Sequence, residues 1–408
     1  MKKRGVGIAC VAMLVLLHAC GLREVGGDGM ISYDDNAWFG PGIQKPGSAA
    51  GNPGKTTWYA VAADYADGYD WRKDSDNGHV KCSLVVFTNG IPIMKIATGE
   101  KYEVTADPDA CRMIDGVLYT DYSTETETVI RKNGSELFRF PVREMICDMV
   151  VEGDDVYTLG QSRDEGGFSF RKNGEALLER PSGHTFSRIQ KDSSGLTFAF
   201  CESIVSGSEA MERYYLVKDG TSVQVAVRED VKRVWDIMVH DGEICYIADF
   251  VGIKVPVLVV GNVMYTLQSA TAADVISCRF LTGGSEIFVE QVVRSKGHDM
   301  QSVIWKHNKV HTSFLEGQTL ASHCVVGDEL CCVTTGFPII RPGVILAFGE
   351  TYSVPANYMS MGGQTMAVKD GMLYVGLTSS KGDCPAVWVD GEMKPLKING
   401  FISHIHVY

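Results

Sequence analysis

The sequence lacks the short motifs that mark several common catalytic centres. Its 408 residues contain no G-x-S-x-G nucleophile elbow, no H-E-x-x-H zinc pair and no G-x-x-x-x-G-K-[ST] phosphate loop. The sequence therefore gives no motif-level evidence for a serine hydrolase of that type, a zinc protease or a nucleotide-binding enzyme. Function has to be inferred from the fold and from the residues that its loops carry.

Long apolar runs are scarce, and the main one lies at the amino end. The run from Val6 to Leu17 follows three basic residues and is too short to span a bilayer comfortably. The residues Leu17-His18-Ala19-Cys20 come next, so the segment resembles a bacterial lipoprotein signal, although His18 replaces the small residue usual at that position. An ordinary secretory signal cut near Ala19 is the alternative.

The lipoprotein resemblance implies a location in the cell. Residues 1–19 would be removed as a signal peptide, and Cys20 would carry the lipid. Because Gly21 and not an aspartate follows the cysteine, the resemblance implies an outer-membrane lipoprotein that faces the periplasm or the cell surface. Residues 20–55 are rich in glycine and proline and have no sustained apolar period, so we expect them to form a flexible tether.

The chain has fewer basic residues than acidic residues. The chain has a formal charge of −12, and removal of the three basic residues of the leader would change it to −15. Nucleic acids and anionic lipid headgroups select for lysine and arginine, so we expect neither as a partner. The membrane would be contacted through the lipid anchor only.

The cysteines lack the C-x-x-C spacing of metal and redox sites. The chain has 12 cysteines, and most of those after the leader lie inside alternating apolar runs. We interpret them as buried free thiols, with Cys82 and Cys384 as the exceptions that could pair.

A repeated hairpin organises the remainder of the chain. In Val129–Phe140, an Asn-Gly pair joins two alternating apolar segments, which is typical of a two-residue β-turn. Eight copies of this turn recur at intervals of 40 to 47 residues, at Gly90, Gly134, Gly174, Gly220, Gly261, Asn308, Gly349 and Gly391. This period, with four strands per copy, predicts an all-β fold, a β-propeller over residues 56–408.

We expect eight blades, with seven as the alternative if the copy around Asn308 is an insertion. The first copy lacks its first strand, and Phe401–Tyr408 alternates like a strand, so the carboxyl end should close the ring. An aromatic residue recurs at a fixed place on the second strand of most copies and should pack between blades. These residues are Tyr59, Tyr119, Tyr157, Phe198, Tyr246, Phe288 and Tyr374. The resemblance is to propellers as a class, since the Gly-His and Trp-Asp pairs of WD40 repeats are missing.

Strand direction predicts which face carries function. The short Asn-Gly and Asp-Gly turns must share one face, and the variable loops the other. The longest loop, Asp64 to His79, combines aromatic rings with carboxylates, as sugar-binding surfaces do. A solvated insertion and a calcium site are the alternatives. The predicted ligand-binding residues are Asp64, Tyr65, Asp67, Tyr69, Asp70, Trp71, Tyr102, Tyr122 and His298.

The leading hypothesis is therefore a lipid-anchored, monomeric and non-catalytic propeller. It would bind a glycan or an envelope protein on its loop face, with no cofactor and no metal. The alternative is a carbohydrate-active hydrolase or lyase with acids at the mouth of the channel.

Overall fold

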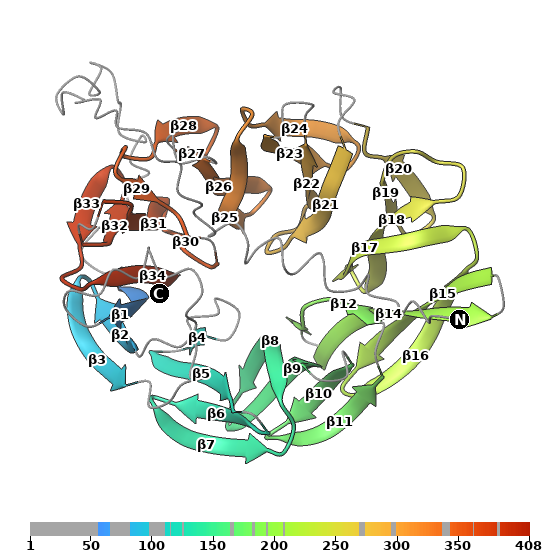
Figure 1. The fold of residues 1–408 in the computed structure, drawn as a ribbon, viewed down its shortest axis with the longest axis horizontal. Coiled ribbons are helices and arrows are strands. Elements are labelled where there is room, and N and C mark those ends of the chain that lie inside the picture. The colour runs from blue at the N-terminus through green and yellow to red at the C-terminus, as the bar shows by residue number, and fades with distance from the viewer. Residues whose placement is uncertain are drawn as a thin grey trace, which may run out of the picture.

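The strands of the chain form eight antiparallel sheets arranged in a ring (Figure 1). The structure is a computed structural model. It describes residues 56–65, 82–97, 111–114, 116–124, 126–163, 167–181, 184–192, 195–206, 209–268, 274–294, 299–336, 343–361, 363–381 and 384–408. Within these ranges the secondary structure is all β, and no helix long and apolar enough to cross a membrane occurs among them.

Each sheet is a four-stranded blade whose first strand faces the axis. The blades of the first half are written here from the inside outwards. Blade 1 is β34 (Gly400–Val407), β1 (Trp58–Tyr65), β2 (Cys82–Thr88) and β3 (Ile91–Ala97). Blade 2 is β4 (Cys111–Ile114), β5 (Val117–Ser123), β6 (Thr128–Lys132) and β7 (Ser135–Phe140). Blade 3 is β8 (Glu144–Glu152), β9 (Asp155–Ser162), β10 (Phe168–Lys172) and β11 (Glu175–Arg180). Blade 4 has a divided first strand, β12 (His184–Phe186) and β13 (Gln190–Asp192), followed by β14 (Gly195–Ser206), β15 (Glu209–Lys218) and β16 (Thr221–Arg228).

The second half repeats the arrangement. Blade 5 is β17 (Val231–His240), β18 (Glu243–Phe250), β19 (Val257–Val260) and β20 (Val263–Thr266). Blade 6 is β21 (Asp274–Leu281), β22 (Phe288–Arg294), β23 (Met300–Lys306) and β24 (Lys309–Ser313). Blade 7 is β25 (Gln318–Val326), β26 (Glu329–Gly336), β27 (Val344–Ala347) and β28 (Glu350–Ser353). Blade 8 again divides its first strand, into β29 (Tyr358–Met359) and β30 (Met366–Lys369), before β31 (Met372–Ser379), β32 (Ala386–Val389) and β33 (Glu392–Pro395).

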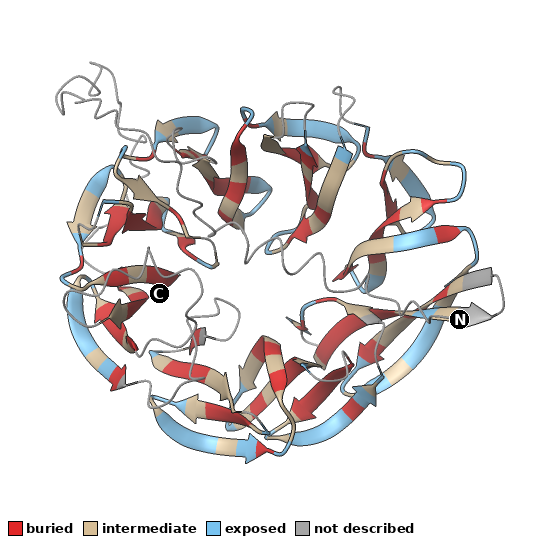
Figure 2. Ribbon diagram, viewed as in Figure 1, coloured by how far each residue is buried: buried red, intermediate tan, exposed pale blue. Residues whose placement is uncertain are grey.

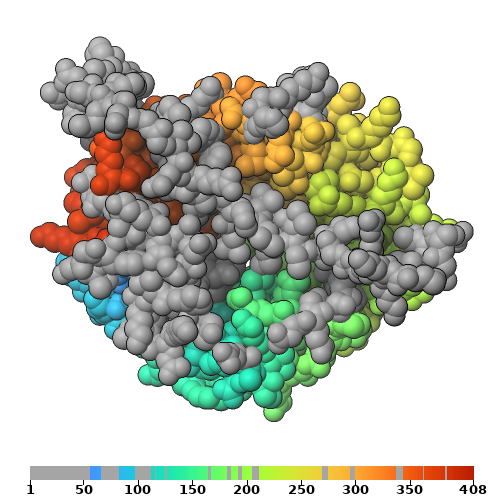
Figure 3. Space-filling model, viewed as in Figure 1, coloured from blue at the N-terminus to red at the C-terminus, as the bar shows by residue number. Residues whose placement is uncertain are grey.

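The first and last strands of the propeller meet in blade 1. Strand β34 pairs with β1 from Trp58 opposite Val407 to Asp64 opposite Gly400, and Figure 1 shows the red carboxyl-terminal strand beside the blue strands. This confirms the predicted closure. The count of eight blades is also confirmed, and the copy around Asn308 is the outer hairpin of blade 6. The blades follow one another around the disc in chain order (Figure 3).

The recurring turns owe their shape to a polar residue with positive φ. Asn89, Asn133 and Asn173 have φ values of 50°, 50° and 52°, a region that asparagine tolerates better than most residues. Their side-chain oxygens accept the backbone N–H groups of Trp58, Leu118 and Val156, at the start of the second strand, at 3.0, 3.0 and 2.8 Å. Each outer turn is thus fastened to the next strand inwards.

The repeated aromatics pack between blades, but they do not all occupy one position. Five of them lie opposite the last residue of the third strand, namely Tyr59, Tyr119, Tyr157, Phe288 and Tyr374. Phe198 and Tyr246 pair with the next-to-last residue instead. The prediction of a single common place is therefore wrong for these two. A shift of one residue turns a side chain to the other face of its sheet, so Phe198 and Tyr246 pack on the preceding blade, against Phe170 at 5.1 Å and Tyr214 at 4.4 Å.

The outer strands are the exposed rim of the disc, and the core lies between the inner strands of neighbouring blades (Figure 2). In β3, β7, β11, β16 and β24 the pairing with the third strand shifts by one residue. Such bulges interrupt an edge and make it a poorer template for another strand.

The cysteines whose side chains are described carry free thiols. Cys82, Cys201, Cys245, Cys278, Cys331 and Cys332 are buried, and Cys147, Cys324 and Cys384 are partly buried. This confirms the interpretation as thiols outside disulfides, and Cys82 and Cys384 are likewise not part of a disulfide.

Candidate functional site

The two faces of the disc differ as the strand directions require. The turns within blades, such as those after β6 and β10, lie on one face, which we call the turn face. The ends of β1, β5 and β18 point to the opposite face, the loop face. Of the predicted ligand-binding residues, Asp64, Tyr65 and Tyr122 lie at this face. The remaining candidates and the lipidation residue lie outside the described residues, namely Cys20, Asp67, Tyr69, Asp70, Trp71, Tyr102 and His298.

Asp64 and Tyr65 help to close blade 1, because they contact Asn399 and Phe401 near the carboxyl end. The Asp64 carboxylate accepts a hydrogen bond from Lys95 Nζ at 2.9 Å and another from the backbone N–H of Asn399 at 3.2 Å. The Tyr65 ring lies 6.3 Å from that of Phe401. Both residues therefore hold the segment before β34 in place, and they also border the loop that follows β1.

Tyr122 lies near the loop-face end of β5. The guanidinium carbon of Arg131 lies 4.3 Å from the centre of its ring. This cation–π arrangement fixes the ring orientation at a partly exposed position. Tyr122 and Asp64 belong to adjacent blades, but among the described residues no hydrogen bond, ion pair or ring contact joins them in one site.

Blade 5 carries a cluster of side chains that was not predicted from the sequence. Arg233 lies 3.5 Å from the ring centre of Trp235, and Trp235 Nε1 donates a hydrogen bond to Asp249 at 2.8 Å. Trp235 is the extra residue of a bulge, because Val234 pairs with Ala248 and Asp236 with Ile247. The bulge places an aromatic ring between two charged groups in the loop-face half of the strand.

Four charged residues form what we call the channel series. Asp148, Arg188, Asp236 and Arg279 occupy matching positions in the first strands of blades 3, 4, 5 and 6, with Arg188 in the gap between β12 and β13. Their charges alternate from blade to blade. No sequence period revealed this series, because the bulges in β8 and β17 and the divided strand of blade 4 change the spacing from copy to copy.

The two aspartates of the series fasten successive blades together. Asp148 accepts hydrogen bonds from Arg112 at 3.0 Å, in blade 2, and from the backbone of Ile189 at 2.7 Å, in blade 4. Asp236 accepts from the backbone N–H of Ile237 at 2.8 Å and of Phe280 at 2.7 Å, in blade 6. Burial raises the pKa of Asp236 to about 6, and these two bonds partly oppose that rise.

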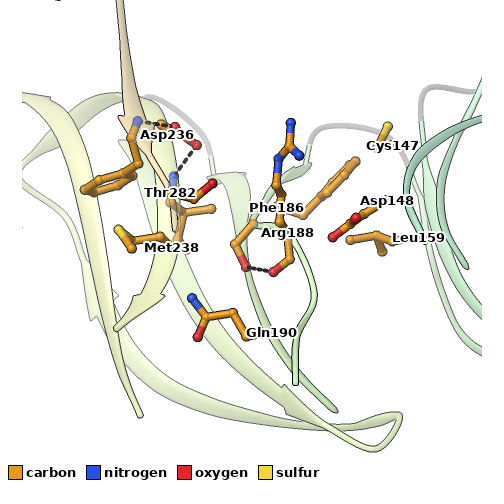
Figure 4. Close-up of a pocket in the computed structure, with 12 residues that line it drawn as sticks. Cys147, Asp148, Leu159, Phe186, Arg188, Gln190, Asp236, Met238 and Thr282 are labelled. Atoms are coloured by element: carbon orange, nitrogen blue, oxygen red, sulfur yellow. Dashed lines mark hydrogen bonds between the residues drawn. The ribbon is translucent and has the colours of Figure 1, made fainter. Parts of the chain in front are cut away.

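A cavity of about 220 Å³ opens beside the channel series. Blades 3 to 6 line it, with Asp148, Arg188, Gln190, Asp236 and Thr282 as polar groups. Figure 4 shows Arg188 between Asp236 on one side and Asp148 on the other. Among the described residues no group of three or more histidine, cysteine or acidic side chains is placed to hold a metal ion.

Comparisons with known proteins give similarity in architecture. No family model matches the chain, and no curated protein matches it in sequence. The chain is similar to the β-propeller domain of the Trilobed protease from Pyrococcus furiosus, with 11% identity, 73% of this chain and 93% of that chain covered, and a TM-score of 0.43. It is similar to BamB from Moraxella catarrhalis, with 8% identity, coverage of 77% and 92%, and a TM-score of 0.43. It is also similar to Hsv2p from Kluyveromyces lactis, with 11% identity, coverage of 65% of this chain and 88% of that chain, and a TM-score of 0.39. These similarities are too distant to transfer a function.

Proposed function

We propose that the chain is a lipid-anchored envelope protein that binds a glycan or an envelope protein on its loop face. The observation that carries this proposal is the difference between the two faces. The loop-face half of the disc holds the Arg233–Trp235–Asp249 cluster, an aromatic ring beside both signs of charge, which is a combination enriched at binding sites. The turn face is built from short turns capped by asparagine and aspartate.

A non-catalytic role fits the carboxylates of the channel wall. Asp148 and Asp236 each accept hydrogen bonds from the backbone of the following blade, so both serve as structural acceptors. A general acid or base needs an oxygen that can reach the substrate proton. The wall of blades 3 to 5 is thus better suited to holding the ring together than to proton transfer.

The anchor is tested by fractionation. Cys20→Ala should leave the precursor without lipid and release the domain from the membrane fraction, because an acidic domain gains no attraction from anionic headgroups. Retention of the variant in washed membranes would refute lipid anchoring.

Binding is tested with the purified domain on a glycan array and as bait in an envelope extract. Trp235→Ala should reduce capture at least about tenfold, as expected for an aromatic anchor. Tyr69→Ala with Trp71→Ala tests the long loop in the same way. Lys132→Ala with Lys172→Ala, on the turn face, is the matched control and should bind normally. Loss of capture in the lysine pair alone would mean that the opposite face binds.

A further inference from the structure

We propose that Cys324 and Cys331 of blade 7 form a reversible cross-strand disulfide when a small disulfide compound oxidises the protein. The two cysteines lie on β25 and β26, the first hairpin of that blade, and both are thiols outside disulfides in the structure. The pair belongs to the core between blades 7 and 8. It therefore goes beyond the proposed partner binding, which uses the loop-face cluster of blade 5.

The register of the hairpin places the two cysteines directly opposite each other. Cys324 pairs with Cys331 in the antiparallel ladder, and two further residue pairs separate them from the turn. The Cα atoms of opposite residues in such a ladder are about 4.5–5.5 Å apart. This distance falls within the range of about 4.4–6.8 Å that disulfides span. The two backbones are thus already placed for the bond.

The side chains of the two cysteines share one face of the sheet. Both pack in the apolar cluster between blades 7 and 8, where Cys331 is fully buried and Cys324 is partly buried. The next residue, Cys332, points to the other face and packs in the cluster between blades 6 and 7. Of the three cysteines of this hairpin, only Cys324 and Cys331 can therefore meet.

The acidity of the two thiols agrees with this placement. A hydrogen bond from Cys324 lowers the pKa of Cys331 below the ordinary value of a thiol, although burial opposes the change. The same bond, and then burial, raise the pKa of Cys324. A lowered pKa favours the thiolate of Cys331, which is the form that attacks a disulfide.

The oxidant is a small disulfide, such as oxidised glutathione. The sulfur of Cys324, the more exposed residue, attacks one sulfur of the oxidant and releases one glutathione, which leaves a mixed disulfide on Cys324. The Cys331 thiolate then attacks the Cys324 sulfur and releases the second glutathione. The two cysteine protons end on the released thiols, and the two electrons reduce the oxidant.

The bond should be easy to reduce again. The Cβ atoms of opposite residues in a ladder are about 4.5–5.5 Å apart, whereas a disulfide prefers about 3.5–4.5 Å. The two strands must therefore approach each other locally, and disulfides held away from their preferred geometry are more readily reduced. Such a bond would respond to the redox state of the surroundings.

The test incubates the purified, folded protein with oxidised glutathione, blocks the remaining thiols and then digests the chain at Asp328 and Glu329. These two residues lie between Cys324 and Cys331. Mass spectrometry should find the two fragments linked by a disulfide, and an excess of reduced glutathione should separate them. Cys331→Ala should abolish the link, and so should Cys324→Ala at the more exposed position.

Cys332→Ala is the matched control, because it removes the adjacent thiol on the other face and should leave the link intact. The proposal is overturned if the fragments stay separate after oxidation, or if Cys332→Ala loses the link while Cys331→Ala keeps it. A link that withstands reduced glutathione would also overturn it. None of these outcomes bears on capture through Trp235.

Discussion

Single residues decide where each blade turns, and Asn173 offers the clearest test. Its φ is 52°, and its side chain accepts the Val156 N–H and donates to Asp155. Asn173→Ala should lower the free energy of unfolding by about 1–2 kcal/mol, because it loses the acceptor and strains the backbone. Asn173→Gly loses the acceptor but not the backbone freedom, so urea unfolding should place it between alanine and wild type. Equal stability of all three proteins would contradict this role.

Another prediction at this scale concerns His406, which lies on β34 opposite Tyr59. Burial, and then the charge of Arg112, lower its pKa to about 4, against about 6.5 in the unfolded chain. The stability that the neutral form provides is complete above pH 6.5 and is lost as the pH falls toward 4. For this partly exposed residue we expect a loss of about 1–2 kcal/mol.

The measurement for His406 is the melting temperature against pH, compared with His406→Gln. Asp236 changes stability in the opposite direction, since its raised pKa of about 6 makes the folded protein less stable as the pH rises from 4 to 6. The difference between the two proteins isolates His406. Parallel curves for wild type and variant would show that His406 does not contribute.

For single residues, prediction from the sequence succeeded where the backbone of a turn accepts only a few residue types. The Asn-Gly and Asp-Gly pairs identified the hairpins, because only a few residue types tolerate positive φ. It failed for Phe198 and Tyr246, which lie one residue further along their strands than the other aromatics. An aromatic residue can fill the space between blades from either side, so its presence does not fix its register.

At the scale of the element, the first strands carry the contacts between blades. Asp148 in β8 connects three blades, through Arg112 and the backbone of Ile189. Its side chain and that of Arg112 are 9% and 11% exposed. Asp148→Ala should therefore cost about 3 kcal/mol in chemical denaturation, since it removes the buried carboxylate that accepts from both Arg112 and Ile189.

The control for Asp148→Ala is the substitution Asp230→Ala. Asp230 forms an ion pair with Arg228 at the exposed rim at 2.9 Å, so its loss should cost no more than about 0.5 kcal/mol. Equal effects of the two substitutions would mean that β8 does not fasten its neighbours.

Bulges explain why the channel wall could not be predicted. The alternation of apolar and polar residues assigns faces only while the register is constant. The register shifts by one residue in β8, β21, β25 and β34, and it shifts at two places in β17. After such a shift the next residues exchange faces. The sequence therefore predicted the strands of blade 5, but not that Trp235 would lie between Arg233 and Asp249.

At the scale of the whole molecule, the ring depends on its last strand. Ile402 and Ile405 of β34 are fully buried, with 0% and 1% of their surface exposed. Deletion of residues 401–408 should lower the melting temperature of the entire domain by about 10 °C or more, since two buried isoleucines alone are worth about 4 kcal/mol.

Tyr408→Phe is the control for this deletion. It removes the hydrogen bond from the Tyr408 hydroxyl to the carbonyl of Met113 while keeping the aromatic ring, and should change the melting temperature by no more than a few degrees. A deletion variant that melts like the wild type would show that β34 does not close the ring.

The period of the repeat also carried the largest part of the prediction, which is the ring of eight blades. A repeat whose units cannot bury their faces alone must stack, and two incomplete ends must meet. The site was less predictable, because six of the nine predicted ligand-binding residues lie outside the described residues. Of the other three, Asp64 and Tyr65 contribute to the closure of blade 1.

Partner binding on the loop face can be tested by photo-cross-linking in intact cells. A photoreactive phenylalanine analogue would replace Tyr122 in one strain and Lys132 in another. Both residues belong to blade 2, the first at the loop face and the second beside the turn that Asn133 caps. Binding on the loop face should give cross-linked products from position 122 and none from position 132. Products from position 132 alone would contradict it.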